Sequence, residues 1–100
     1  MKINKYVKFV EISLETVQSS RMKLYSSKYS KHVYTQHQLL VLILLNEYIN
    51  TNYRDFVELI YLMSDIKVKL DLDTIPHFTT LQKFVSRIPS SLFNLIYQEL

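Results

Sequence analysis

The hydrophobic pattern of the chain is centred on residues 36–49, where seven consecutive apolar side chains run from Leu39 to Leu45. At about 100° per residue, such a run covers every face of a helix. A helix that is apolar all round must be enclosed by other elements. The run is too short to cross a bilayer, which takes about 20 apolar residues. We therefore predict that residues 36–49 form the central helix of a small helical domain.

Both ends of this predicted helix carry residues that favour a helix boundary. Thr35 and Gln38 have the spacing of a capping box, in which each side chain bonds the backbone N–H of the other residue. Tyr34 precedes the box, where an apolar side chain can pack against the first turn. Asn50 follows Ile49, at the position where a left-handed residue commonly ends a helix.

Four further segments each carry one apolar stripe with the three- and four-residue spacing of a helix packed on one side. They are predicted at 4 to about 25, at 52–64 with Asn52 as N-cap, at 79–88 with Thr79 and Gln82 as a second capping box, and after Pro89. The stripe residues are Tyr6, Phe9, Val10, Leu14, Val17, Tyr53, Phe56, Val57, Ile60, Met63, Leu81, Phe84, Val85, Ile88, Leu92, Phe93, Leu95 and Ile96.

Residues 66–73 alternate between apolar and charged side chains, which is nominally the pattern of a strand. A single strand would have no partner, so we favour a short helical turn and a loop that pack Ile66, Leu70 and Leu72 inward. The predicted fold is all-α, a small bundle of about five helices around residues 36–49. Segments 52–64 and 80–88 resemble a loose helix-turn-helix unit. Its connection of about 14 residues exceeds the usual three to four.

Composition narrows the possible chemistry. The 100 residues include no Cys and no Gly, which excludes disulfides, thiolate zinc sites and glycine-rich phosphate loops. The length fits a single domain over 1–100, with 1–34 as a basic N-terminal helix and connector and 35–100 as the helical core. The N-terminus shows no signal-peptide pattern, so a cytoplasmic protein is expected.

Charge is distributed unevenly along the chain. Residues 1–38 carry a net charge of +5, residues 39–76 carry −3, and residues 77–100 carry +1. A basic arm fits a polyanionic partner, and Lys28, Lys31 and His32 are candidate phosphate contacts. An ordinary solvated surface explains the same distribution equally well.

The outward face of the predicted helix 80–88 is the best candidate for recognition chemistry. Thr80, Gln82, Lys83 and Arg87 lie on it, and no acid does. Gln can bond adenine with two hydrogen bonds, and Lys or Arg can bond guanine in the major groove of DNA. Thr79 at the helix start would suit a phosphate. The alternative is a surface helix without a partner.

No metal, cofactor or small-molecule ligand is predicted. His32, His37 and His77 lack the spacing of a helical zinc site, and Asp65, Asp71 and Asp73 lack that of a calcium loop. The expected interpretation of these acids is a solvated loop.

Three segments resemble the N-terminal domain of DDE-type insertion-sequence transposases, particularly an archaeal group. They are YTQHQLL at 34–40, EY at 47–48 with YRDFVEL at 53–59, and LDTIPHFTTLQKF at 72–84. The resemblance covers about residues 29–88. Asn50 and Asp71 stand where relatives often carry Gly, and both tolerate left-handed geometry.

The resemblance implies a helical domain that binds the terminal inverted repeats of an insertion sequence. In that family a following RNase-H-like domain carries two Asp and one Glu with divalent metal ions. No acid of this chain matches those positions, so we expect the chain not to be an enzyme. The resemblance further implies that it binds double-stranded DNA and is associated with the nucleoid. Tyr53 and Arg54 are expected to help position the DNA.

The apolar pattern of the last helix is still running at Leu100, which favours a fragment of a longer protein or a truncated product. Apolar residues within 92–100 would then be exposed. They suggest the alternative of an interaction module that pairs with itself or with full-length transposase. A remnant without function is the third interpretation.

Overall fold

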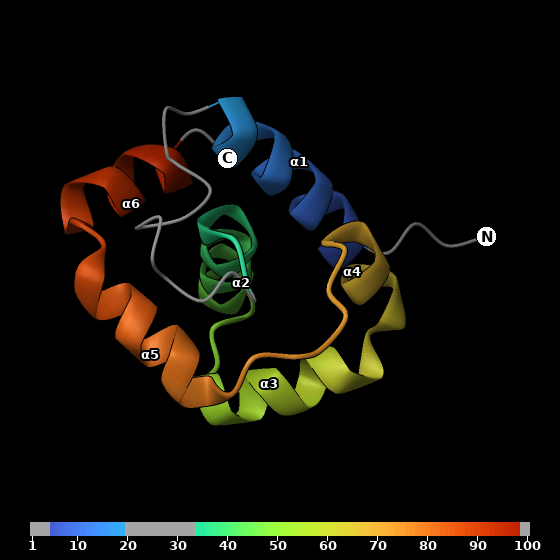
Figure 1. Cartoon of the computed structure of the whole chain (residues 1–100). Helices are drawn as coiled ribbons and strands as arrows, with labels where there is room; N and C mark the ends of the chain where they lie inside the picture. The colour runs from blue at the N-terminus through green and yellow to red at the C-terminus, as the bar shows by residue number, and fades with distance from the viewer. Residues whose placement is uncertain (1–4, 20–33, 99–100) are drawn as a thin grey trace.

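The computed structural model describes residues 5–19 and 34–98, without the side chains of Leu92 and Leu95. In that part of the chain there are six helices and no strand, which confirms the all-α prediction. Figure 1 shows α2 nearly end-on, with the other helices arranged around it. The helices are α1 (Lys5–Ser19), α2 (Gln36–Ile49), α3 (Tyr53–Leu62), α4 (Ser64–Lys69), α5 (Phe78–Arg87) and α6 (Ser90–Gln98).

Helix α2 has the predicted bounds and the predicted central place. Every residue from Leu39 to Asn46 is buried. The capping box is present: the Thr35 hydroxyl accepts from the Gln38 N–H at 3.0 Å, and Gln38 Oε1 accepts from the Thr35 N–H at 2.9 Å. Asn50 ends the helix in the left-handed region, with φ 65° and ψ 57°. The predicted capping box and the predicted left-handed residue at the end of α2 are therefore both confirmed.

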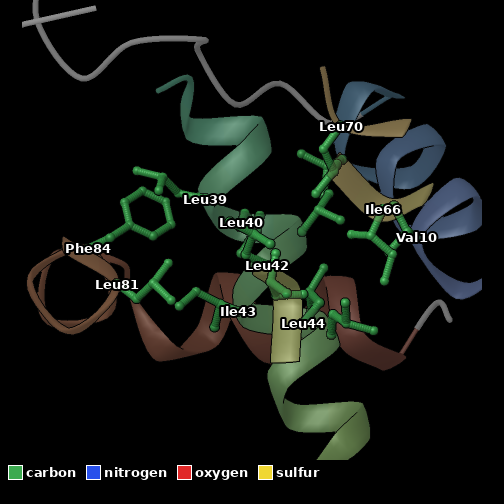
Figure 2. Close-up of a cluster of buried hydrophobic side chains, with 14 of the residues drawn as sticks. Val10, Leu39, Leu40, Leu42, Ile43, Leu44, Ile66, Leu70, Leu81 and Phe84 are labelled. Atoms are coloured by element: carbon green, nitrogen blue, oxygen red, sulfur yellow. The ribbon is translucent and has the colours of Figure 1, made fainter. Parts of the chain in front are cut away.

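Figure 2 shows how α2 supplies both sides of the core. Leu39 and Ile43 point toward α5, while side chains of α1 and α4 lie on the opposite side. Packing on two sides explains why no face of residues 39–45 is polar. The labelled partners are Leu81 and Phe84 on α5, and Val10, Ile66 and Leu70 on the other side.

Helix α1 packs along α2 with its predicted stripe. Val10 and Val17 are fully buried, and Phe9 stacks on Tyr48 of α2 at a centroid distance of 4.3 Å. Ser13 is also buried, and its hydroxyl has no hydrogen-bond partner. Residues 20–25 of the predicted first helix lie outside the described residues.

The helix predicted at 52–64 is α3, which ends at Leu62, two residues before its predicted end. The short helical turn favoured for the start of 66–73 is α4, which begins at Ser64. Asn52 caps α3 as predicted, accepting from the Asp55 N–H at 2.8 Å. The chain then breaks at Met63, with φ −106° and ψ 71°, before α4. The reason lies in the spacing: Ile60 and Ile66 are six residues apart, which places them on different faces of a continuous helix. The break lets both be buried.

The alternating segment 66–73 is helical and then a loop, as favoured. Ile66, Leu70 and Leu72 are buried, which confirms their predicted inward packing. Asp71 has φ 55°, a left-handed conformation that Asp tolerates better than most residues. A surface ion pair between Lys69 and Glu11, at 2.8 Å, joins α4 to α1.

Helices α3 and α5 contact each other, but they are not consecutive elements. The predicted helix-turn-helix unit therefore contains α4 and an eight-residue loop between its two helices. No tight turn fixes their crossing, so α5 depends on how that loop is held. The last helix, α6, buries Ile96 and packs Phe93 and Tyr97 partly against the core.

Candidate nucleic-acid interface

Helix α5 begins at Phe78, two residues earlier than a Thr79 cap would allow. Its N-cap is His77, whose Nδ1 accepts from the Thr79 N–H at 3.3 Å and lies 2.8 Å from the Thr79 hydroxyl. The predicted capping box of Thr79 and Gln82 is therefore wrong, because His77 is the N-cap and Thr79 lies within the first turn of the helix. The Thr79 amide and hydroxyl are already engaged, so a phosphate at this point would have to displace His77.

The two faces of α5 separate sharply. Leu81 and Phe84 are buried, and Val85 and Ile88 pack partly against the core, which confirms the predicted apolar stripe. Three side chains proposed to contact DNA are exposed on the opposite side: Gln82, Lys83 and Arg87. Thr79 and Thr80 are half-buried, so they contribute less reachable surface than predicted from sequence.

The exposed arc of α5 carries two cations and no carboxylate. Lys83 and Arg87 are four residues apart, so they lie one above the other on the helix. The Ser86 hydroxyl between them donates to the Lys83 carbonyl at 2.7 Å and stays close to the helix surface. Helix α5 has ten residues and is about 15 Å long. Lys83 and Arg87 both lie in its C-terminal half.

Arg54 is an exposed cation on α3, beside the start of α5. Its guanidinium lies over the ring of Phe78, 4.9 Å from the centroid, at the start of α5. An arginine over an aromatic face is attracted by the ring and is held in one orientation. This contact joins the start of α5 to a residue 24 positions earlier in the chain.

Tyr53, the neighbour of Arg54, is less accessible. It is half-buried at the start of α3 and packs against the core. Burial raises the pKa of its phenol above the ordinary value, and the negative charge of Glu47 raises it further. The phenol is therefore neutral near pH 7 and can donate a hydrogen bond, but it is a weaker candidate for contact than Arg54.

Gln38 holds the loop that leads into α5. Its Nε2 donates to the carbonyls of Leu70 and Asp71 at 2.8 and 3.1 Å, while its Oε1 completes the capping box of α2. Close by, the Tyr34 and Thr74 hydroxyls lie 2.8 Å apart. The start of the central helix thereby fixes the loop whose far end positions α5.

Sequence reasoning missed the residues that organise the start of this face. His77 is outside the usual set of cap residues, and Phe78 shows its role only when α3 is adjacent. The second role of Gln38, the hydrogen bonds from its Nε2 to the loop, is equally unpredictable from sequence, since the capping box uses only its Oε1. Lys28, Lys31 and His32, the predicted phosphate contacts of the basic connector, lie outside the described residues.

Two further features of the described chain bear on its chemistry. No helix there is long and apolar enough to cross a membrane. Within the same residues, no group of three or more His, Asp or Glu side chains is placed to hold a metal ion. Comparison of the chain with protein-family models, with curated proteins and with solved structures finds no match.

Proposed function

We propose that this chain is the N-terminal DNA-binding domain of a DDE-type transposase and that it binds the terminal inverted repeats of an insertion sequence. The observation that carries the proposal is the outer face of α5, where Gln82, Lys83 and Arg87 are exposed and no acid is present. The sequence resemblance over about residues 29–88 supplies the family. The two together support DNA as the partner.

The proposed binding mode places α5 in the major groove, which is wide enough to admit one helix. Gln82 can contact an adenine edge, and Lys83 can contact a guanine edge or a phosphate. Arg87, at the helix end, and Arg54, beside the helix start, are suited to the phosphates that border the groove. The buried Leu81 and Phe84 hold the helix against α2 from behind.

In this proposal the chain binds DNA and does not cut it. Cleavage and strand transfer would belong to the catalytic domain of the family, whose three acids have no counterpart at matching positions of this sequence. The role of α5 is to place that domain on the ends of the element.

The experiment is a fluorescence-anisotropy titration with two duplexes of equal length, at low and moderate salt. One carries the terminal repeats of the element that encodes the chain, and the other carries a scrambled sequence. A preference for the terminal sequence that survives the salt increase is expected. Equal and strongly salt-sensitive binding to both would mean a cationic surface that does not recognise sequence, and would overturn the proposal.

The double variant Lys83→Ala with Arg87→Ala tests the assignment of α5. We expect affinity for the terminal duplex to fall by about 1–3 kcal/mol for each side chain that reads a base edge. The log–log salt slope should drop by about one for each side chain that neutralises a phosphate. Lys5→Ala with Lys8→Ala is the matched control, since it removes two exposed cations from α1 and should retain the sequence preference. An unchanged affinity and slope in the α5 variant would show that another surface binds.

A further inference from the structure

Five large apolar side chains are exposed among the described residues, and they fall into two groups. Ile12 and Tyr48 line one groove, and Tyr61, Leu62 and Val68 lie on α3 and α4. Single exposed apolar residues are normal on a protein surface, whereas grouped ones mark places of contact. Neither group includes the outer face of α5.

The first group belongs to an open groove of about 420 Å³, which we call the α1–α6 groove. That volume lies within the range of ligand-binding clefts. Its lining is apolar and aromatic except for two exposed lysines on α1. The lining residues are Lys5, Lys8, Phe9, Ile12, Tyr48 and Tyr97.

Rigid aromatic contacts shape the floor of this groove. Tyr48 is clamped by Phe9, which stacks on it, and by Tyr6, whose ring meets it edge-on at 6.0 Å. Such a preformed floor loses little side-chain entropy when it is covered. The α1–α6 groove therefore suits an apolar insert with negative charge at its border.

Two members of the second group, Tyr61 and Leu62, are exposed at the end of α3. Together with the exposed acids Glu58 and Asp65 they make up the surface that we call the α3 ridge. Leu62 is 83% exposed and Tyr61 is 63% exposed. Glu58 lies three and four residues before them, so all three share one face of the helix. The break at Met63 leaves Leu62 at the helix end and brings the exposed Asp65 just after it.

We propose that the α3 ridge of one copy of this chain docks into the α1–α6 groove of a second copy. Tyr61 and Leu62 would cover the aromatic floor, and Glu58 and Asp65 would face Lys5 and Lys8. The two surfaces are complementary in both apolar character and charge, which is what selects another copy of this chain as the occupant.

The α3 ridge belongs to α3 and α4, whereas the α1–α6 groove is lined by residues of α1, α2 and α6. The proposed contact between two molecules therefore joins unlike surfaces. Repetition of such a contact produces rings or open chains instead of closing at a symmetric pair. With only a few side chains buried, the association is weak and depends on concentration.

Sedimentation velocity at low salt tests this inference. The wild-type sedimentation coefficient should rise between about 10 μM and about 1 mM, as expected of an interface smaller than the standard size. A monomer throughout this range overturns the proposal and leaves the groove to another occupant. This result does not depend on DNA binding, since neither surface uses Gln82, Lys83 or Arg87.

Charge reversal identifies the surfaces. Lys5→Glu with Lys8→Glu, and separately Glu58→Lys with Asp65→Lys, should each abolish the rise. All four residues are exposed, so circular dichroism should show the wild-type fold in each. Mixing the two variants should restore association, because the mixture again contains complementary surfaces. Association that persists in either variant alone, or fails to return on mixing, overturns the proposal.

Two controls separate position from net charge. Lys83→Glu with Arg87→Glu changes the net charge as much as the groove variant but on α5, and it should still associate. Leu62→Ser removes the apolar centre of the α3 ridge without changing charge, and it should lose association. Loss of association in the α5 variant, together with retained association in Leu62→Ser, would place the interface elsewhere and overturn the proposal.

Discussion

Helices α2 and α5 contact each other, yet they are built in opposite ways. Helix α2 buries every residue from 39 to 46, whereas α5 buries only Leu81 and Phe84 and exposes Gln82, Lys83 and Arg87. In a helix that is enclosed on every side, each side chain contributes to the stability of the fold. In a helix with an exposed polar face, the side chains of that face can be substituted without changing the fold. The difference predicts that folding and binding can be altered separately in this molecule.

The strongest test of the difference is Leu42→Ala in the central helix. Leu42 is 1% exposed, and truncation of a buried Leu leaves a cavity in addition to the lost transfer free energy. We expect the free energy of unfolding to fall by about 2–5 kcal/mol. Urea denaturation followed by circular dichroism measures it.

The matched change on α5 is Lys83→Ala alone. Because its side chain is exposed on the face opposite the apolar stripe, the free energy of unfolding should stay within about 0.5 kcal/mol of the wild type. Similar decreases for Leu42→Ala and Lys83→Ala would remove the distinction between the two helices.

An intermediate effect is expected where α2 meets the loop before α5. Gln38→Glu keeps the oxygen that accepts from Thr35, but it puts a carboxylate against the carbonyls of Leu70 and Asp71. Removing the two donated hydrogen bonds should cost about 1–3 kcal/mol of unfolding free energy. The favourable position of an acid at a helix start offsets about 0.3–1 kcal/mol.

Thr35→Ala is the comparison for this variant, because it removes a cap and leaves the amide of Gln38 bonded to the loop. It should cost about 1 kcal/mol in the same denaturation experiment. If Gln38→Glu unfolds at the wild-type urea concentration, the loop is held by its buried apolar side chains alone.

An effect that depends on pH is expected at Tyr53, between the core and the proposed interface. Its pKa is raised in the folded state by burial and by Glu47, so the folded protein holds the phenolic proton more tightly than the unfolded chain. That contribution is complete below the unfolded pKa of about 10 and is lost as the pH rises through the folded pKa. Wild-type stability should therefore decline more steeply above pH 10 than that of Tyr53→Phe. Parallel urea midpoints for the two proteins between about pH 8 and pH 11 would contradict this sign.

Much of the fold follows from local features of the chain. The seven apolar residues from Leu39 to Leu45 require enclosure, and Thr35, Gln38 and Asn50 set the bounds of α2. The stripes of α1, α3 and α5 are identifiable by their spacing, because helix periodicity depends only on neighbours three and four residues apart. The boundary at Met63 lies within two residues of the predicted end of the helix at 52–64, a precision typical of helix ends.

The face of α5 is predictable in its residue types but not in its surroundings. Lys83 and Arg87 oppose the apolar stripe by simple periodicity. The contact of His77 with the Thr79 hydroxyl and the partial burial of Thr80 are not predictable in this way. Both depend on how the chain packs around the start of the helix. The α1–α6 groove and the α3 ridge have no signal in the sequence pattern. Of the described apolar side chains within 92–100, Ile96 is buried, and Phe93 and Tyr97 are partly buried against the core.

The sequence by itself determined that the protein is helical, that α2 lies at its centre, and which face of each amphipathic helix is polar. These properties rest on periodicity and capping, which act over four residues or fewer. The tertiary structure alone decided that Arg54 lies over Phe78, that Gln38 bonds Leu70 and Asp71, and where apolar side chains remain uncovered. Each of these contacts joins segments that are distant in the chain. Their relative positions are set only when the apolar faces of these segments pack against the same central helix.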